Sequence, residues 1–389
     1  MTTCKWFVFF LLFVLIFSNV RTVHAAPENL YARYALLMDA TNRRVLFEKN
    51  GYEEVPMAST TKIMTLLIAL EQGNLDDVVT ISKYCETIPR VRLGMKEGEQ
   101  YRLKDLLYCM MLESYNDAAV AVAEHIGGSV SAFALLMNEK AEDLGAYHTQ
   151  FVTPNGLDAE GHYTTAYDLA LITSYAIDNE MFREIISTSH YSFHEQTKGT
   201  LCEVDNKDVF LTMYEGAIGV KTGFTSKAGY CFVGAVEKNE KRLVSVVLAS
   251  GWPPNKSYKW QDTTKLMDHG INDFTTVKIL SKGDTFHTIN VENAIQTTKM
   301  EPYVDVDESL LLKTEDKVNY DIELPENLNA PVLKGTQVGN VTVTINDEIY
   351  KKYPLYADKT YDEITFFYIY KKIVLKYVYL TIDFFASTC

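Results

Sequence analysis

A serine and a lysine three positions apart, Ser59 and Lys62, stand at the start of the apolar run Ile63 to Leu70. Pro56 disfavours helix before them and Gly73 ends the run after them, so we predict one helix with the serine in its first turn. Residues three apart share a helix face, and the free N–H groups of a helix start add positive potential beside a hydroxyl. Such a pair can provide a serine nucleophile that a neighbouring amine activates.

The Ser-x-x-Lys pattern alone is a weak signal, because serine is a common helix cap and lysine a common exposed helix residue. Two further tripeptides follow it, each present once in the chain: Ser114-Tyr115-Asn116 and Lys221-Thr222-Gly223. By itself the first could be a capping segment and the second an ordinary turn. The ordered set of all three motifs resembles the penicillin-recognising serine acyl-transferases.

A longer stretch makes the resemblance more specific. The loop Phe151 to Leu157 and the segment His162 to Ala170 resemble a stretch of the D-alanyl-D-alanine carboxypeptidases in particular. The resemblance extends from about Glu28 to Tyr356. It implies an α/β (α+β) penicillin-binding/β-lactamase-like transpeptidase fold, in which an antiparallel sheet packs with a helical cluster, plus a small C-terminal all-β domain. One departure is Tyr115, where glycine or alanine is more usual; this side chain either narrows the cleft or packs beside it.

The same resemblance implies catalytic roles. Ser59 would be the nucleophile and Lys62 its base, with the amine kept neutral by burial and by a second cation at Lys221. Ser114 would relay a proton to the leaving group. Asn116 would bind the amide of the substrate and orient Lys62.

Substrate binding would fall to the Lys-Thr-Gly segment. Lys221 and Thr222 would engage the terminal carboxylate of the substrate, and Gly223 would permit a ligand backbone to approach closely. The N–H groups of Phe224 and of the nucleophile would form the oxyanion hole. Lys256 could add a second positive contact, although an exposed loop lysine is the simpler interpretation. The resemblance implies no metal and no organic cofactor.

Helices and strands must bring these motifs together. The sequence predicts the Ser-x-Asn motif in a break between two helices, and the Lys-Thr-Gly motif at the start of a β-rich block. The expected strands are Tyr34 to Asp39, Arg44 to Glu48, Cys231 to Val236 and Leu243 to Ser250, and the expected helices are Leu103 to Leu112, Asp117 to Ile126, Ser129 to Leu144, Thr164 to Ile177 and Trp260 to Phe274.

Length and charge limit the possible classes of protein. The chain has 389 residues, 47% of them hydrophobic, and a formal net charge of −14. That length suits two domains, and the acidic balance argues against nucleic acid as a partner. The apolar run Trp6 to Phe17 is too short to span a bilayer, and small residues follow it at Val23-His24-Ala25. This pattern is typical of a signal peptide over residues 1–25.

The rest of the chain is predicted to contain three parts. Residues 26–276 would form the catalytic serine DD-peptidase domain, residues 278–360 a β-rich domain, and residues 361–389 an amphipathic membrane-anchor tail. A helix over Thr365 to Phe385 would have a wide apolar face and a narrow charged one, which suits a membrane surface, and its lysines argue against a spanning helix. An edge strand or a buried helix is the alternative. The enzyme would act outside the cytoplasmic membrane, peripheral at its outer face or at the cell wall.

Two other sets of side chains could have chemical roles. Cys202 and Cys231 could form a bridge, but the odd number of cysteines after the signal favours free thiols. His190, Ser192 and His194 alternate along a predicted strand. A metal pair is conceivable there, but without a third ligand nearby a solvated face is favoured.

Three rival functions remain open. Class A β-lactamases share the motifs, but their Glu-x-x-Leu-Asn loop is replaced here by Glu160-Gly161-His162-Tyr163-Thr164, so slow turnover of a penicillin acyl-enzyme is expected. A DD-endopeptidase would use the same machinery on cross-links. A catalytically silent cell-wall-binding module would lack a motif residue, and none is missing. The favoured function is a secreted serine D-alanyl-D-alanine carboxypeptidase that removes the terminal D-alanine from peptidoglycan stem peptides and is inhibited by β-lactams.

Overall fold

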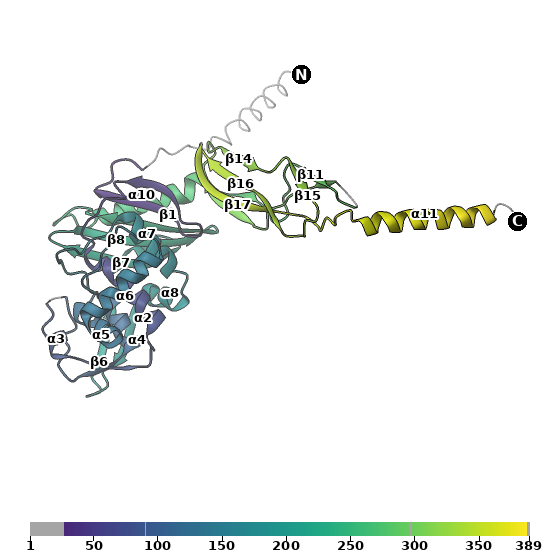
Figure 1. The fold of residues 1–389 in the computed structure, drawn as a ribbon. Helices are drawn as coiled ribbons and strands as arrows, with labels where there is room; N and C mark the ends of the chain where they lie inside the picture. Colours follow the sequence, from purple (N-terminus) through teal and green to yellow (C-terminus); the bar gives the residue numbers. More distant parts are fainter. Residues whose placement is uncertain (1–26, 90, 296–297, 387–389) are drawn as a thin grey trace, which may run out of the picture. The chain divides into compact units, whose positions relative to one another are not determined.

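A five-stranded antiparallel sheet is the central element of the first part of the computed structural model (Figure 1). The structure describes residues 27–89, 91–295 and 298–386. They fall into two compact units, one ending at Asp273 and the other starting at Phe274. The strand order is β2-β1-β9-β8-β7, with β1 Tyr34–Asp39, β2 Arg44–Lys49, β7 Ala217–Thr225, β8 Gly229–Lys238 and β9 Lys241–Leu248.

Helices cover the central strands of this sheet. Strand β9 is buried at all but one position, so both of its faces are covered. Helix α10 (Tyr258–Asp273) packs against β8 and β9, and α7 (Ala166–Ala176) packs against β1 and β9. Strand β7 is different because it lies at the edge of the sheet, where one row of its backbone groups has no strand beside it.

Helix α2 (Lys62–Gln72) is the centre of the helical cluster. Its residues 62–69 are all buried, and it contacts α7 and four further helices. These are α4 Leu103–Leu112, α5 Asn116–Gly127, α6 Val130–Asp143 and α8 Glu180–Ser187. Alanines on α5 allow close packing, and Gly128 ends that helix with a φ of 74°, a left-handed conformation that glycine adopts without strain.

Short elements complete the first unit. They are the 3₁₀ turn η1 Ala58–Thr61, helices α3 Lys83–Glu86 and α9 Phe210–Met213, and the two-stranded pairs β3 Val78–Thr80 with β4 Gln100–Arg102 and β5 His190–His194 with β6 Leu201–Asp205. Residues His190, Ser192 and His194 are exposed on β5, and His190 pairs with Asp205 at 2.8 Å. No group of three or more His, Cys, Asp or Glu among the described residues could hold a metal ion.

The second unit is all-β apart from its last helix. Its strands form three small sheets around two apolar clusters, one centred on Val341 and Leu355 and the other on Val291 and Met300. The elements are β10 Thr275–Leu280, β11 Ile289–Glu292, β12 Lys299–Met300, β13 Glu308–Leu312, β14 Val318–Glu323, β15 Asn327–Asn329, β16 Gln337–Ile345, β17 Glu348–Tyr356 and helix α11 Phe366–Ala386.

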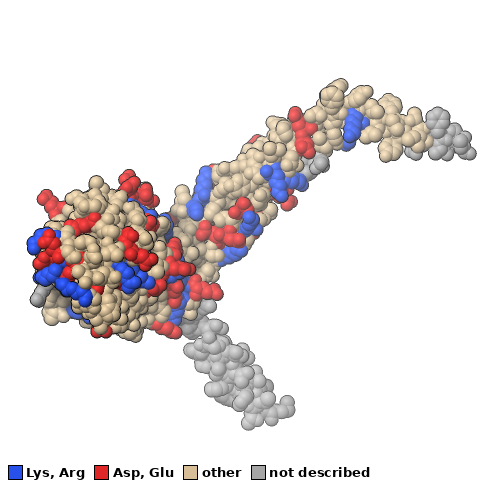
Figure 2. Space-filling view, turned by 90° about the horizontal axis from the view of Figure 1, so that it is seen from below, with Lys and Arg blue, Asp and Glu red and all other residues tan. Residues whose placement is uncertain are grey.

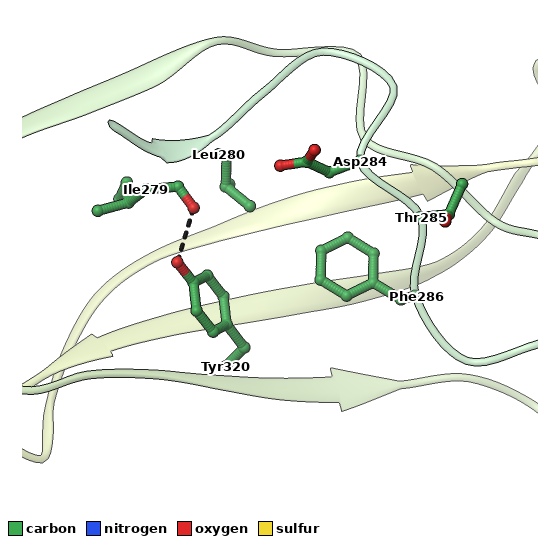
Figure 3. Close-up of a pocket in the computed structure, with 6 residues that line it drawn as sticks. All are labelled: Ile279, Leu280, Asp284, Thr285, Phe286 and Tyr320. Atoms are coloured by element: carbon green, nitrogen blue, oxygen red, sulfur yellow. Dashed lines mark hydrogen bonds between the residues drawn. The ribbon is translucent and has the colours of Figure 1, made fainter. Parts of the chain in front are cut away.

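A surface pocket of about 410 Å³ lies in this second unit (Figure 3). The Tyr320 hydroxyl donates to the carbonyl oxygen of Ile279 at 2.7 Å, and the Phe286 ring and the Asp284 carboxylate stand beside it. Leu280 and Thr285 complete its lining. None of these residues belongs to the predicted motifs.

The predicted fold class is confirmed, because an antiparallel sheet with a helical cluster and a separate all-β unit are both present. Helix α8 was missed: it is short, and only Phe182, Ile185 and Ile186 are buried on it. Cys85, Cys109, Cys202 and Cys231 are free thiols, so the conceivable Cys202–Cys231 bridge is absent.

Two predictions concern the ends of the chain. The signal peptide predicted over residues 1–25 lies outside the described residues. The predicted C-terminal helix is present as α11, which spans 21 residues. Within the described ranges, no individual helix has the length and low charge needed to cross a bilayer; α5 and α6 meet that test only as a pair bent by 83°.

Candidate active site

Ser59 lies in a tight turn that precedes α2. The predicted helix therefore starts later than expected: η1 contains Ser59, and α2 begins at Lys62. The Thr60 hydroxyl donates to the Met57 carbonyl at 2.6 Å and the Thr61 hydroxyl to the Ala58 carbonyl at 2.8 Å, and these bonds stabilise the tighter turn. Ala58 has a φ of 49°, which is strained for a residue with a side chain.

The side-chain nitrogen of Lys62 lies between three oxygen atoms. Its Nζ is 2.9 Å from Ser59 Oγ, 2.8 Å from Asn116 Oδ1 and 2.5 Å from the carbonyl oxygen of Asn155. Lys62 is fully buried. Burial, and then the nearby Lys221, hold the pKa of Lys62 well below its usual value, while Asp117 opposes them. This environment therefore favours the neutral form of the amine.

The loop that carries Asn155 is pressed against η1, the turn that contains Ser59. Gly156 has a φ of 81°, and a Cβ atom there would lie 2.0 Å from the Ala58 carbonyl oxygen, so only glycine fits. The Thr65 hydroxyl donates to the Pro154 carbonyl at 2.6 Å, which fixes the loop to α2. Sequence reasoning missed the Asn155 carbonyl, because a backbone acceptor has no residue signature; the Pro-Asn-Gly turn was the available signal.

The Ser-x-Asn motif lies where α4 ends and α5 begins. Ser114 has a φ of 64°, so a second strained residue stands two positions before Asn116. Asn116 is the first residue of α5, so the starts of α5 and α2 face one another through the bond between Asn116 and Lys62. Tyr115 packs against the hydrophobic core, and burial raises its pKa to about 12. Tyr115 is only partly buried, so its contact with the core leaves both alternatives for this tyrosine open.

Strand β7 brings the Lys-Thr-Gly motif to the same turn. A Cβ at Gly223 would lie 3.1 Å from the Ser59 nitrogen, so glycine allows the strand to approach the turn of Ser59. Phe224 is 42% exposed, with its ring against that of Tyr230. Lys221 is buried, and burial with the neighbouring Lys259 lowers its pKa to about 7, while Asp208 opposes them.

Two charged residues of this region were missed from the sequence. Asp208 is buried behind β7, where burial raises its pKa to about 7 against the influence of Lys221 and Lys259. Lys259 is also buried, over the ring of Trp260 at 4.6 Å. Lys256, the sequence candidate for a second positive contact, is exposed. Nothing in the spacing marked Asp208 or Lys259, because their burial follows from packing around β7 and β8.

The β-lactamase alternative finds no support in this loop. Glu160 is exposed, whereas His162 two residues later is buried with its Nε2 2.9 Å from the Thr61 hydroxyl. Glu160 is therefore not part of the buried group around Lys62. Of the predicted residues, the structure brings Ser59, Lys62 and Asn116 into direct contact and places Gly223 against the same turn.

Known proteins share both units of this structure. A model of the family described as D-alanyl-D-alanine carboxypeptidase matches residues 20–251, and one described as the C-terminal domain of penicillin-binding protein 5 matches residues 274–363. D-alanyl-D-alanine carboxypeptidase DacF of Bacillus subtilis is 31% identical over 87% of this chain and 87% of its own length. D-alanyl-D-alanine carboxypeptidase DacC of Escherichia coli is 30% identical over 90% of this chain and 89% of its own length.

Solved structures agree with the sequence matches. The crystal structure of penicillin binding protein 5 from Haemophilus influenzae aligns with a TM-score of 0.74 and 28% identity, covering 87% of this chain and 100% of that one. The carboxypeptidase model by itself covers more than half of the residues, and the relatives align along most of the chain. The chain therefore belongs to the D-alanyl-D-alanine carboxypeptidase family.

Proposed function

We propose that Ser59 is the nucleophile, and Lys62 its general base, in a serine D-alanyl-D-alanine carboxypeptidase that removes the terminal D-alanine of peptidoglycan stem peptides. The observation that carries the proposal is the set of three oxygen atoms around the Lys62 amine. Asn116 Oδ1 and the Asn155 carbonyl can only accept hydrogen bonds. A neutral amine has two N–H groups and one lone pair, so these acceptors take both N–H groups and leave the lone pair for Ser59 Oγ.

Acyl transfer then follows from this geometry. The Ser59 oxygen attacks the carbonyl carbon of the D-alanyl-D-alanine bond while its proton moves to Lys62. The backbone N–H groups of Ser59 and Phe224 stabilise the oxyanion, and removal of one such donor typically costs about 10²–10³ in rate. The proton passes through Ser114 to the departing D-alanine amine. Water hydrolyses the ester that remains, which restores the serine and releases the shortened peptide.

Strand β7 would hold the substrate. As an edge strand it can pair with an extended peptide, which gains main-chain hydrogen bonds without displacing a neighbour. Lys221 and Thr222 would bind the terminal carboxylate. The buried Lys221 supplies a positive charge close to the place where that carboxylate must end, since its neighbour Gly223 lies against the nucleophile turn.

Mass spectrometry after incubation with benzylpenicillin tests the proposal. The chain without residues 1–25 should gain the mass of one intact penicillin on the peptide that contains Ser59, and Ser59→Ala should gain none. Ser226→Ala, which removes an exposed hydroxyl just after β7, is the matched control and should be labelled as the wild type. A folded wild type that forms no adduct would contradict the proposal and favour a catalytically silent module.

The lifetime of the adduct and a comparison of two peptide substrates distinguish the carboxypeptidase from two related activities. An adduct that disappears within seconds would indicate a β-lactamase. Comparison of a monomeric stem peptide with a cross-linked dimer would distinguish carboxypeptidase from endopeptidase, because only the second releases two monomers from the dimer. We expect a long-lived adduct and release of D-alanine from the monomer.

We also propose a location for the enzyme. Residues 1–25 would direct secretion, residues 26–276 would act on the cell wall, residues 278–360 would form the β-rich domain, and residues 361–389 would attach the protein to the outer face of the membrane. The support for the last point is α11, on which Phe366 and Phe367 are 76% and 79% exposed. Exposed rings of this size, together with the lysines of the same helix (blue in Figure 2), suit an anionic membrane surface.

A further inference from the structure

His162 connects the loop of Asn155 to η1, the turn of the proposed nucleophile Ser59, through a chain of hydrogen bonds. We call η1 the nucleophile turn. The Val152 N–H donates to His162 Nδ1 at 3.0 Å, and His162 Nε2 lies 2.9 Å from Thr61 Oγ1. The Thr61 hydroxyl in turn donates to the Ala58 carbonyl at 2.8 Å. This chain of hydrogen bonds therefore ends at Ala58, the residue before Ser59.

The direction of each bond in this chain is fixed. Because a backbone N–H donates to Nδ1, that nitrogen carries no proton, and the proton of the neutral ring is on Nε2. Nε2–H then donates to Thr61, whose own proton is directed to Ala58. Burial lowers the pKa of His162 to about 4, so the ring stays neutral at the pH at which the enzyme would work. A charged ring would have a donor at Nδ1 and would break the bond from Val152.

The two segments that these hydrogen bonds join both bear on the site. In the loop, the Asn155 carbonyl contacts the Lys62 amine at 2.5 Å. In the turn, Ala58 holds the strained φ of 49° that precedes the nucleophile. Gly156 fits against Ala58 only because it lacks a Cβ, so a small outward movement of the loop would open the contact with Ala58 and withdraw the Asn155 carbonyl.

We propose that His162 is a positioning residue for acylation: through Thr61 it holds the loop 152–158 and the nucleophile turn together, so that the Lys62 lone pair stays directed at Ser59. The inference rests on the proposed function and adds to it a residue that touches neither substrate nor nucleophile. Its effect should fall on the chemical step, because His162 and Thr61 form their hydrogen bonds with the loop and with the nucleophile turn, not with Lys221 or Thr222. A displacement of about 1 Å at such a site costs about 10² in rate.

Paired variants test the inference through the acylation of Ser59 by benzylpenicillin, separated into the binding constant and the first-order acylation rate. His162→Phe keeps a ring but removes both polar contacts, and Thr61→Val keeps the shape but removes the hydroxyl. Each should slow acylation about 10²-fold with little change in binding. His162→Gln, which retains an N–H donor, and Thr61→Ser, which retains the hydroxyl, should recover most of the rate.

Thr173→Val is the matched control, because this threonine is buried and its hydroxyl donates to the Leu169 carbonyl of its own helix at 2.7 Å. It should acylate at the wild-type rate. If His162 were only a core residue, the folded fraction of each variant would fall while its acylation rate stayed unchanged, and the inference would be wrong. If His162→Phe does not fold, Thr61→Val against Thr61→Ser decides in the same way. A wild type without any adduct would contradict the proposed function instead.

Discussion

The carbonyl oxygen of Asn155 lies 2.5 Å from Nζ of Lys62, so a loop almost a hundred residues along the chain supplies one of the three oxygen atoms around this amine. Lys62 is fully buried, and the other two oxygen atoms belong to side chains. Because a backbone oxygen cannot be removed by substitution, the position of the loop itself must be changed to test its contribution.

Gly156→Ala should displace the loop. The residue has a φ of 81°, and its new Cβ would fall 2.0 Å from the Ala58 carbonyl oxygen. We expect a loss of about 3 kcal/mol in the free energy of unfolding, from backbone strain and overpacking together, and acylation about 10²-fold slower. Gly161→Ala is the control: its φ is 76°, but the nearest atom to a Cβ is 4.0 Å away. It should cost only the backbone strain, and equal effects of both variants on acylation would refute this explanation.

The affinity for a substrate carboxylate should depend on pH through Lys221. Its pKa is lowered to about 7, so the cation is lost as the pH rises through that value, and KM for a D-alanyl-D-alanine peptide should rise. In Lys221→Arg the charge persists at any working pH, so KM should stay level. Measurement of KM between pH 5.5 and 9 checks both variants, and a KM of the wild type that stays level across this range would count against the assignment.

Asp208→Asn should move the same transition. The Asp208 carboxylate opposes the loss of the Lys221 proton, so its removal lowers the pKa of Lys221 further. The rise in KM should therefore occur at lower pH than in the wild type. A transition that moves to higher pH, or that does not move, would show that Asp208 does not act on Lys221.

Stability in acid should depend on His162. The folded protein binds a proton there only near pH 4, whereas the unfolded chain does so near 6.5. The unfolded state thus binds more protons between these values, and the free energy of unfolding falls by about 3 kcal/mol as the pH drops from 6.5 to 4. His162→Gln cannot titrate and should lose less stability over this range. Urea unfolding at several pH values measures the difference, which should vanish above pH 7.

Membrane attachment should depend on α11 and its lysines. The chain without residues 1–25 should sediment with vesicles that contain anionic lipid, and a chain that also ends at residue 364 should not. Replacement of Lys371, Lys372 and Lys376 by Gln should weaken binding to anionic vesicles by about 10²-fold, since each lysine contributes about 1 kcal/mol near such a surface. Binding of the truncated chain equal to that of the longer one would exclude the helix as the anchor.

The three motifs and the main elements could be predicted from the sequence because their signals are local. Leu103–Leu112 is a helix with the predicted limits, and β1 is present as expected. The start of α2 was wrong by a few residues, since the hydroxyls of Thr60 and Thr61 favour a tighter turn than helix propensity suggests.

The missed parts of the site depend on contacts between distant segments. The carbonyl of Asn155 could not be predicted, because any residue has the same atom. His162 was seen within a familiar segment but had no role until its bond to Thr61 was known. Asp208 acquires its raised pKa only when packing removes it from water beside Lys221. These are properties of the assembled unit, which no window of sequence contains.

The close approach of Gly223 to the Ser59 nitrogen also has a consequence for the folding of this protein. The nucleophile turn is made early in the chain, but the strand that completes its surroundings comes more than 150 residues later. Such non-local contacts form late, because the long intervening chain must first be ordered. A molecule released from synthesis before β7 therefore has its serine but not its reactive site. A fluorescent penicillin should accordingly label only completed molecules, and could serve as a reporter of maturation.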